Sequence, residues 1–156
     1  LVSLGTGLGF AMAAEGKVLQ TTTGSPLISI WNLPYNGGIL EDYASKRGFY
    51  NIWEKVTGNR PPQEMTVAEM GRMAREGDET SLEVFRRVGE FIGIHIKDKL
   101  KQYRIRCLLF GGQISRSFMF MEDAIRKELS DIEGLMVTTV SDFSNAAFKG
   151  LKAKLS

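Results

Sequence analysis

Two short glycine-rich stretches, each following an apolar run, are the clearest candidates for chemistry in this sequence. Residues 5–9 read Gly-Thr-Gly-Leu-Gly after the run 1–4, and a glycine pair, 111–112, follows the run 107–110. Glycine lets the backbone turn tightly and present its N–H groups to an anion. Each stretch is therefore either a phosphate-binding turn or a turn that needs glycine for its conformation and binds nothing. Residues 5–9 are not a Walker loop, because no Gly-Lys-Ser/Thr follows them.

The reactive side chains outside these stretches have ordinary structural explanations. His95, the one histidine, lies at the edge of an apolar helical stripe and is predicted to be a packing residue. Cys107, the one cysteine, lies in an apolar run and is predicted to be buried. A single cysteine excludes an internal disulfide and a zinc site built on several thiolates. Glu41 begins a predicted helix, where a carboxylate suits the helix dipole.

The composition is that of a globular protein with one domain. The chain has 156 residues, of which 43% are hydrophobic and 24% charged. Its net charge of +2 is too close to neutral to indicate nucleic-acid binding. No apolar run approaches the ~18 residues that a membrane span needs. We therefore expect one domain over residues 1–156, in the cytoplasm, with neither a nucleic acid nor a membrane as its partner.

The first part of the chain is predicted to be rich in strands and turns. A glycine-punctuated strand pair is expected near the start, with Glu15-Gly16 as a tight turn. Helical patterning begins at Ile39 and is expected to continue to about Lys55. Four aromatic residues of this part are predicted to lie in a core or an interface rather than around a ligand: Trp31, Phe49, Tyr50 and Trp53.

Two further helices have recognisable start signals. Thr66 and Glu69 have the spacing of a capping box, and Asp78 can cap a long helix with an apolar stripe. Gly89 and Gly93 lie within that long helix, where each costs about 1 kcal/mol relative to alanine. They therefore predict that another backbone packs closely against the helix.

A strand, a helix, a strand and a last helix are expected after the long helix. The run 107–110 is predicted to be a strand covered on both faces, followed by a helix over 117–129 and a strand over 135–140. Ser141 or Asp142 is predicted to cap the last helix. The predicted fold class is therefore α/β, with a mixed sheet that begins antiparallel and has flanking helices.

Five stretches of the sequence, taken in order, resemble those of a known family. They are LGTGLG, GGILEDYASKRG, GDETSLEVFRRVGEFIGIHIKDKL, CLLFGGQIS and NAAFKGL. Together they resemble the C-terminal half of a ROK-family protein. That family contains bacterial sugar kinases and sugar-responsive transcriptional repressors and belongs to the actin-like ATPase superfamily. The resemblance covers nearly the whole chain and implies a ribonuclease-H-like lobe of a two-lobed protein.

The resemblance also implies roles for individual residues and a cofactor, ATP with Mg²⁺. It places Gly5, Thr6, Gly7 and Gly9 in a loop that faces the phosphates, Gly111 and Gly112 beside the adenosine, and Glu41 on the hydroxyls of a small sugar. The family's first phosphate loop and catalytic aspartate lie in its N-terminal half. We therefore expect an N-terminal partner lobe outside this chain and no catalytic residue within it.

One segment departs from the family pattern. The family usually carries a cysteine cluster and a Gly-x-x-Gly-His segment that bind a structural zinc. Here Ile39 stands at the position of the last cysteine, and residues 21–38 contain neither cysteine nor histidine. We therefore expect no zinc and a sugar site that differs from the usual one.

Three functional hypotheses follow from these observations. The first is the nucleotide- and sugar-binding lobe of an ATP-dependent sugar kinase, transferring a phosphoryl group to a hexose or amino-sugar hydroxyl and inactive as an isolated chain. The alternative is the sensor and dimerisation lobe of a ROK-type transcriptional regulator, without catalysis. The third is a packing module whose glycine turns are vestigial. An apolar face that a partner lobe would otherwise cover also predicts a homo-oligomer.

Overall fold

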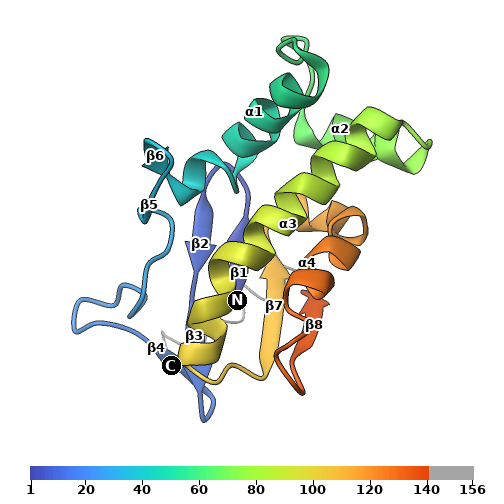
Figure 1. Cartoon of the computed structure of the whole chain (residues 1–156). Coiled ribbons are helices and arrows are strands. Elements are labelled where there is room, and N and C mark those ends of the chain that lie inside the picture. Colours follow the sequence, from blue (N-terminus) through green and yellow to red (C-terminus); the bar gives the residue numbers. More distant parts are fainter. Residues whose placement is uncertain (141–156) are drawn as a thin grey trace.

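The fold is built on a four-stranded mixed sheet, described by a computed structural model that covers residues 1–140 (Figure 1). Its strands, in spatial order, are β2 (Leu8–Phe10), β1 (Val2–Leu4), β7 (Cys107–Gly111) and β8 (Met136–Thr139). The β1–β2 pair is antiparallel, whereas β1, β7 and β8 run parallel to one another. This arrangement confirms the predicted α/β fold with a mixed sheet that begins antiparallel.

Two small hairpins complete the strands of the described residues. The first joins β3 (Met12–Ala14) to β4 (Lys17–Leu19), and the second joins β5 (Pro34–Tyr35) to β6 (Gly38–Ile39). Glu15 and Gly16 form the first turn with φ values of 51° and 75°, which favours glycine at the second position. The tight turn predicted at these two residues is therefore confirmed.

Helices follow from residue 40 onward. They are the 3-10 turn η1 (Leu40–Asp42), α1 (Lys46–Thr57), α2 (Val67–Arg75), α3 (Glu79–Gln102), the 3-10 segment η2 (Ile114–Phe120) and α4 (Glu122–Glu128). The regular α1 begins later than the helix predicted from Ile39. One reason is that Asp42 Oδ2 accepts a hydrogen bond from the Ile39 backbone N–H at 3.0 Å, closing a local turn. Ser45 is then extended, with φ −136°, and the helix starts after it.

The predicted caps of α2 and α3 are present. Thr66 Oγ1 accepts from the Glu69 N–H at 3.1 Å, and Asp78 Oδ1 accepts from the Ser81 N–H at 2.7 Å. The Glu69 carboxylate pairs with Arg72 (2.8 Å), an ion pair one turn along α2. These caps define where two of the three long helices begin.

The core lies between the sheet and the helices that cover it, with α3 and α4 lying over the sheet in Figure 1. The buried strand residues alternate along each strand, as one covered sheet face requires: Val2, Leu4, Leu8, Phe10, Leu108, Phe110 and Val137. Cys107 begins β7 on the opposite face and is exposed. The prediction of a buried cysteine in a strand covered on both faces was therefore wrong. In a continuous apolar run, the sequence does not show which residues face the core and which face the other side of the sheet.

The last helix predicted after Ser141 or Asp142 lies outside the residues that the structure describes. Within residues 1–140, no helix is both long enough and apolar enough to cross a membrane.

Close packing of α3 against the α4 region explains the two glycines within α3. A Cβ atom at Gly89 would lie 2.7 Å from the Met121 carbonyl oxygen, and one at Gly93 would lie 2.7 Å from Glu128 Cβ. Neither distance is available to a real side chain without movement of the neighbour. The predicted close approach of another backbone is therefore confirmed.

A side chain at Gly89 should separate these helices. We expect Gly89→Val to lower the free energy of unfolding by about 1–3 kcal/mol, because the new methyl groups meet the Met121 backbone rather than a flexible side chain. Urea denaturation measures the change. Asp98→Ala, at an exposed position of the same helix, is the control and should change stability by less than about 0.5 kcal/mol. Equal stability of Gly89→Val and the unchanged protein would contradict the close contact.

Candidate functional site

The two glycine-rich turns lie side by side at one edge of the sheet. Strands β1 and β7 are parallel neighbours, with Ser3 opposite Gly111, so their carboxyl ends reach the same edge. At Gly112 φ is +90°, and a Cβ atom there would lie 2.3 Å from the Leu4 carbonyl oxygen. Only glycine fits this position, because both the backbone conformation and the neighbouring strand exclude a side chain. The edge where parallel strands end is a common place for ligands in α/β proteins.

The first turn is attached to the beginning of α1. The Lys46 N–H donates to the Gly5 carbonyl oxygen at 2.9 Å, and the Gly5 N–H donates to the Gly7 carbonyl oxygen at 3.1 Å. The N-terminus of a helix carries a partial positive charge and unpaired N–H groups. This geometry places the positive end of α1, together with the Lys46 residue, next to the turn.

Glu41 connects the segment before α1 to the same turn. Its Oε2 accepts a hydrogen bond from the Leu8 N–H at 3.0 Å. A Cβ atom at Gly7 would lie 2.7 Å from that oxygen, so the glycine makes room for the carboxylate. The Arg47 guanidinium lies 3.5 Å from Glu41 and 3.0 Å from Asp42, at exposed fractions of 23% and 27% for the two carboxylates. Glu41 therefore restrains the turn while part of its carboxylate faces solvent.

A first groove of about 670 Å³ brings most of the sequence-predicted site residues together. They are Gly5, Thr6, Gly7, Gly9, Gly112 and Glu41. Gly111, the last residue of β7, is buried and does not line this groove. Among residues 1–140, Glu41 is the only charged residue that lines it. The Glu41 carboxylate and the backbone amides of the glycine turn therefore line one end of the site.

A second groove of about 580 Å³ adjoins the first and shares Gly5, Thr6 and Gln113 with it. Three cationic residues, Lys46, Arg75 and Arg116, help to line it, and no carboxylate of the described part of the chain does. Its remaining lining includes the start of α2 and the start of η2. The pair of grooves is thus uncharged or acidic at one end and cationic at the other.

Sequence reasoning missed the cationic groove. Arg75 and Arg116 are 41 residues apart and approach only through the packing of α2 on η2, where an Arg75 Nη2 to Arg116 carbonyl distance of 3.5 Å is found. No local motif marks either residue. The capping signal at Thr66 was the one available clue, because it located a helix N-terminus that lines this groove.

Trp31 does not lie in the core, which was one of the two predicted places for the aromatic residues. Phe49 and Trp53 are buried, as expected for core residues. Trp31 is 45% exposed and lines the first groove with Glu41. It is therefore a groove residue and no part of the core.

His95 packs as predicted. Its Nδ1 lies 2.7 Å from the Phe91 carbonyl oxygen, its ring stacks on Phe91 at 4.0 Å, and Tyr35 meets it edge-on at 4.5 Å. These rings and Tyr43 hold the β5–β6 hairpin against α3. Among residues 1–140, no group of three or more His, Cys, Asp or Glu side chains is placed to hold a metal ion.

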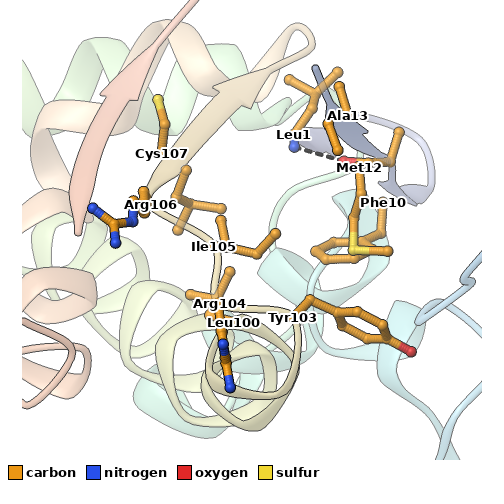
Figure 2. A pocket seen from close by; sticks show the side chains of 13 residues that line it. Leu1, Phe10, Met12, Ala13, Leu100, Tyr103, Arg104, Ile105, Arg106 and Cys107 are labelled. Carbon is orange, nitrogen blue, oxygen red and sulfur yellow. Dashed lines mark hydrogen bonds between the residues drawn. The ribbon is translucent and has the colours of Figure 1, made fainter. Parts of the chain in front are cut away.

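Another hollow, of about 350 Å³, lies at the opposite edge of the sheet (Figure 2). Figure 2 shows Phe10, Met12, Leu100 and Ile105 among its side chains, with Cys107 at the start of β7. None of the sequence-predicted site residues lines it. The carboxyl ends of β1 and β7, with their glycine turns, are therefore the candidate functional site.

Comparison with known proteins assigns the family. A family model described as the ROK family matches residues 34–147. The chain belongs to the ROK family. The match includes Glu41 and the glycine pair after β7. No curated protein matches the chain significantly.

Solved structures of ROK proteins share the fold. A candidate sugar kinase from Cytophaga hutchinsonii superposes with a TM-score of 0.85 at 18% identity, over 99% of this chain and 56% of the other. A ROK family glucokinase from Streptomyces griseus, in complex with glucose and AMPPNP, has a TM-score of 0.70 at 17% identity, over 89% of this chain and 53% of the other. A ROK family transcriptional regulator, a homologue of the E. coli MLC protein, has a TM-score of 0.75 at 18% identity, over 88% and 40%.

These comparisons confirm the fold predicted from the resemblance. At identities below 20%, the three structures show a shared fold alone. The chain spans 56%, 53% and 40% of their lengths. A kinase and a regulator stand among the structures that share this fold.

The hydrogen bond between Leu8 and Glu41 should control the mobility of the glycine turn. We expect Glu41→Ala to speed hydrogen exchange of the Leu8 amide by about tenfold, the effect of losing a bond worth about 1.5 kcal/mol. Glu41→Gln keeps a carbonyl acceptor and should change the rate much less. Exchange measured by NMR gives both values. Equal rates in Glu41→Ala and the unchanged protein would show that the carboxylate does not restrain the turn.

Proposed function

We propose that this chain is the nucleotide- and sugar-binding lobe of an ATP-dependent sugar kinase, inactive without a second lobe. The observation that carries the proposal is the pair of adjoining grooves that share Gly5, Thr6 and Gln113. One groove ends at the Glu41 carboxylate and the other is lined by three cations. A sugar and a polyphosphate would meet over the glycine turn in such a site.

The cationic groove has the properties that a nucleotide requires. Backbone N–H groups of the glycine turns, the N-terminus of α1 and the Lys46 side chain suit phosphate oxygens. The turn at Gly111 and Gly112, which the family resemblance places beside the adenosine, adjoins the cationic groove, and Gly112 itself lines the first groove. The Ser115 hydroxyl donates to the Gly112 carbonyl oxygen at 2.6 Å. ATP, accompanied by Mg²⁺, would supply the phosphoryl group for transfer.

Glu41 suits the hydroxyl groups of a small sugar. A carboxylate accepts hydrogen bonds only, and two sugar hydroxyls can donate to its free lone pairs. The Leu8 N–H already occupies one position on Oε2. A sugar bound to Glu41 would thus be fixed relative to the turn that holds the phosphates, which is the positioning that phosphoryl transfer needs.

The described residues offer the grooves no free general base for activating a sugar hydroxyl. Within residues 1–140, Glu41 is the one carboxylate that lines either groove, and it is engaged by Leu8 and Arg47. Phosphoryl transfer to an alcohol needs a group that accepts the hydroxyl proton. We therefore place that group on a partner lobe outside this chain. Such a kinase would work in the cytoplasm, where ATP is present.

The same observation favours a second candidate, the sensor lobe of a ROK-type transcriptional regulator. A lobe that binds a sugar through Glu41 and carries no base can report the sugar without transforming it. The two candidates differ in a measurable way in the full-length protein. A kinase forms ADP when a hexose such as D-glucose is added, whereas a sensor binds the hexose and forms no ADP.

Nucleotide binding tests the shared premise directly. The wild-type chain should bind Mg²⁺–ATP in a calorimetric titration, and Gly5→Val should weaken the affinity by about tenfold or more. A Cβ atom at Gly5 meets nothing within 4 Å and its φ is not left-handed, so valine fills the groove without straining the fold. Ala14→Val, in the exposed β3–β4 hairpin, is the matched control and should bind like the wild-type chain.

The outcomes separate the proposal from its rivals. Loss of binding in Gly5→Val alone would support working phosphate turns. Equal affinity in both variants would place the nucleotide elsewhere and contradict the proposal. No binding by any form would favour the packing module with vestigial turns.

A further inference from the structure

Trp31 has an unusual position for a large apolar side chain. It is 45% exposed and lines the first groove together with Glu41 and the glycine turn. Single exposed apolar residues are common on protein surfaces and need no function. Here the exposed side chain lines the same groove as the Glu41 carboxylate. An aromatic ring and a carboxylate are the two kinds of group that suit the apolar face and the hydroxyls of a sugar.

The backbone of Trp31 is fixed by the structure around it. Its carbonyl oxygen accepts from the Glu41 N–H at 3.0 Å, and the Leu40 N–H donates to the Leu33 carbonyl oxygen at 3.0 Å. Ile30, the preceding residue, is 1% exposed and anchors the segment in the core. Trp31 is therefore exposed although its segment is anchored. Its backbone is hydrogen-bonded directly to Glu41, the residue that bears the carboxylate.

We propose that Trp31 is a sugar-contacting residue that stacks on the C–H face of a pyranose while Glu41 binds its hydroxyls. A pyranose has an apolar face of C–H groups and a rim of hydroxyls. Its C–H groups carry small positive charges, which the negative face of the indole ring attracts. A carboxylate beside an aromatic ring therefore matches both surfaces of the ligand. This inference rests on the proposed function and adds a residue that selects pyranose sugars.

A nucleobase is the rival occupant, because it also stacks on aromatic rings. The position of Trp31 favours the sugar. Trp31 lines the groove that holds Glu41 and does not line the cationic groove. Gly112, which the family resemblance places beside the adenosine, also lines the first groove, so the Mg²⁺–ATP affinity of the Trp31 variants decides between the two occupants.

The chain offers a direct spectroscopic test, because it has two tryptophans and the other, Trp53, is buried at 8% exposure. In Trp53→Phe the emission comes from Trp31 alone. We expect D-glucose to change that emission in a saturable way, while Mg²⁺–ATP leaves it nearly unchanged. Calorimetry without the Trp53 substitution gives a second readout, should the core variant fail to fold.

Variants at position 31 complete the test. We expect Trp31→Ala to weaken D-glucose affinity by about tenfold and Trp31→Phe to retain most of it, because the second keeps an aromatic face. Leu27→Ala removes another exposed apolar side chain, 52% exposed and outside the groove, and should change nothing. The affinity for Mg²⁺–ATP should be the same in all three variants.

Each contrary result would contradict either the stacking role of Trp31 or the sugar-binding function itself. Unchanged D-glucose affinity in Trp31→Ala, with loss in Glu41→Ala, would overturn the stacking role and leave the proposed function standing. A fall in Mg²⁺–ATP affinity instead would assign Trp31 to the base and overturn the inference. Absence of D-glucose binding in every form would overturn the sugar-binding function and the inference with it.

Discussion

The parallel pairing of β1 with β7 is the constraint on which the rest of the structure depends. These strands are separated by about one hundred residues in the chain, yet Val2 lies opposite Phe110 and Ser3 opposite Gly111. Parallel strands need a long connection, which here runs from β2 through the two hairpins and η1 to the helices α1 to α3. Because the strands run the same way, both glycine turns reach one edge. Gly112 then has to be glycine, since the Leu4 carbonyl oxygen leaves no room for a Cβ atom.

The helices between β1 and β7 support this strand pairing, because they pack closely against neighbouring elements. The long α3 receives α4 at Gly89 and Gly93, where the absence of side chains lets the two segments approach closely. The β5–β6 hairpin is held on another side of α3 by the rings of Tyr35, Phe91 and His95. This anchoring holds the hairpin that precedes Glu41 against α3.

Glu41 links the two ends of the candidate site. Its hydrogen bond to Leu8 and its ion pair with Arg47 connect the glycine turn, the 3-10 turn η1 and the first turn of α1. A carboxylate that is partly engaged in this way can still accept from a ligand, because its exposed fraction is 23%. Binding of a ligand to Glu41 would therefore affect the glycine turn, because the ligand and the turn would contact the same carboxylate. The same coupling would serve a kinase or a sensor.

Much of this protein was determined by local sequence alone. The Glu15-Gly16 turn, the caps at Thr66 and Asp78 and the close approach at Gly89 depend on neighbours along the chain or on one missing Cβ atom, and short-range rules captured them. Cys107 was predicted wrongly, because an apolar residue in an apolar run gives no sign of which face it will occupy. The cationic groove was not predicted, since Arg75 and Arg116 meet only when α2 packs on η2. The sequence by itself therefore determined the elements and their glycine turns, whereas tertiary structure decided which side chains share a groove, because that depends on contacts between residues far apart in the chain.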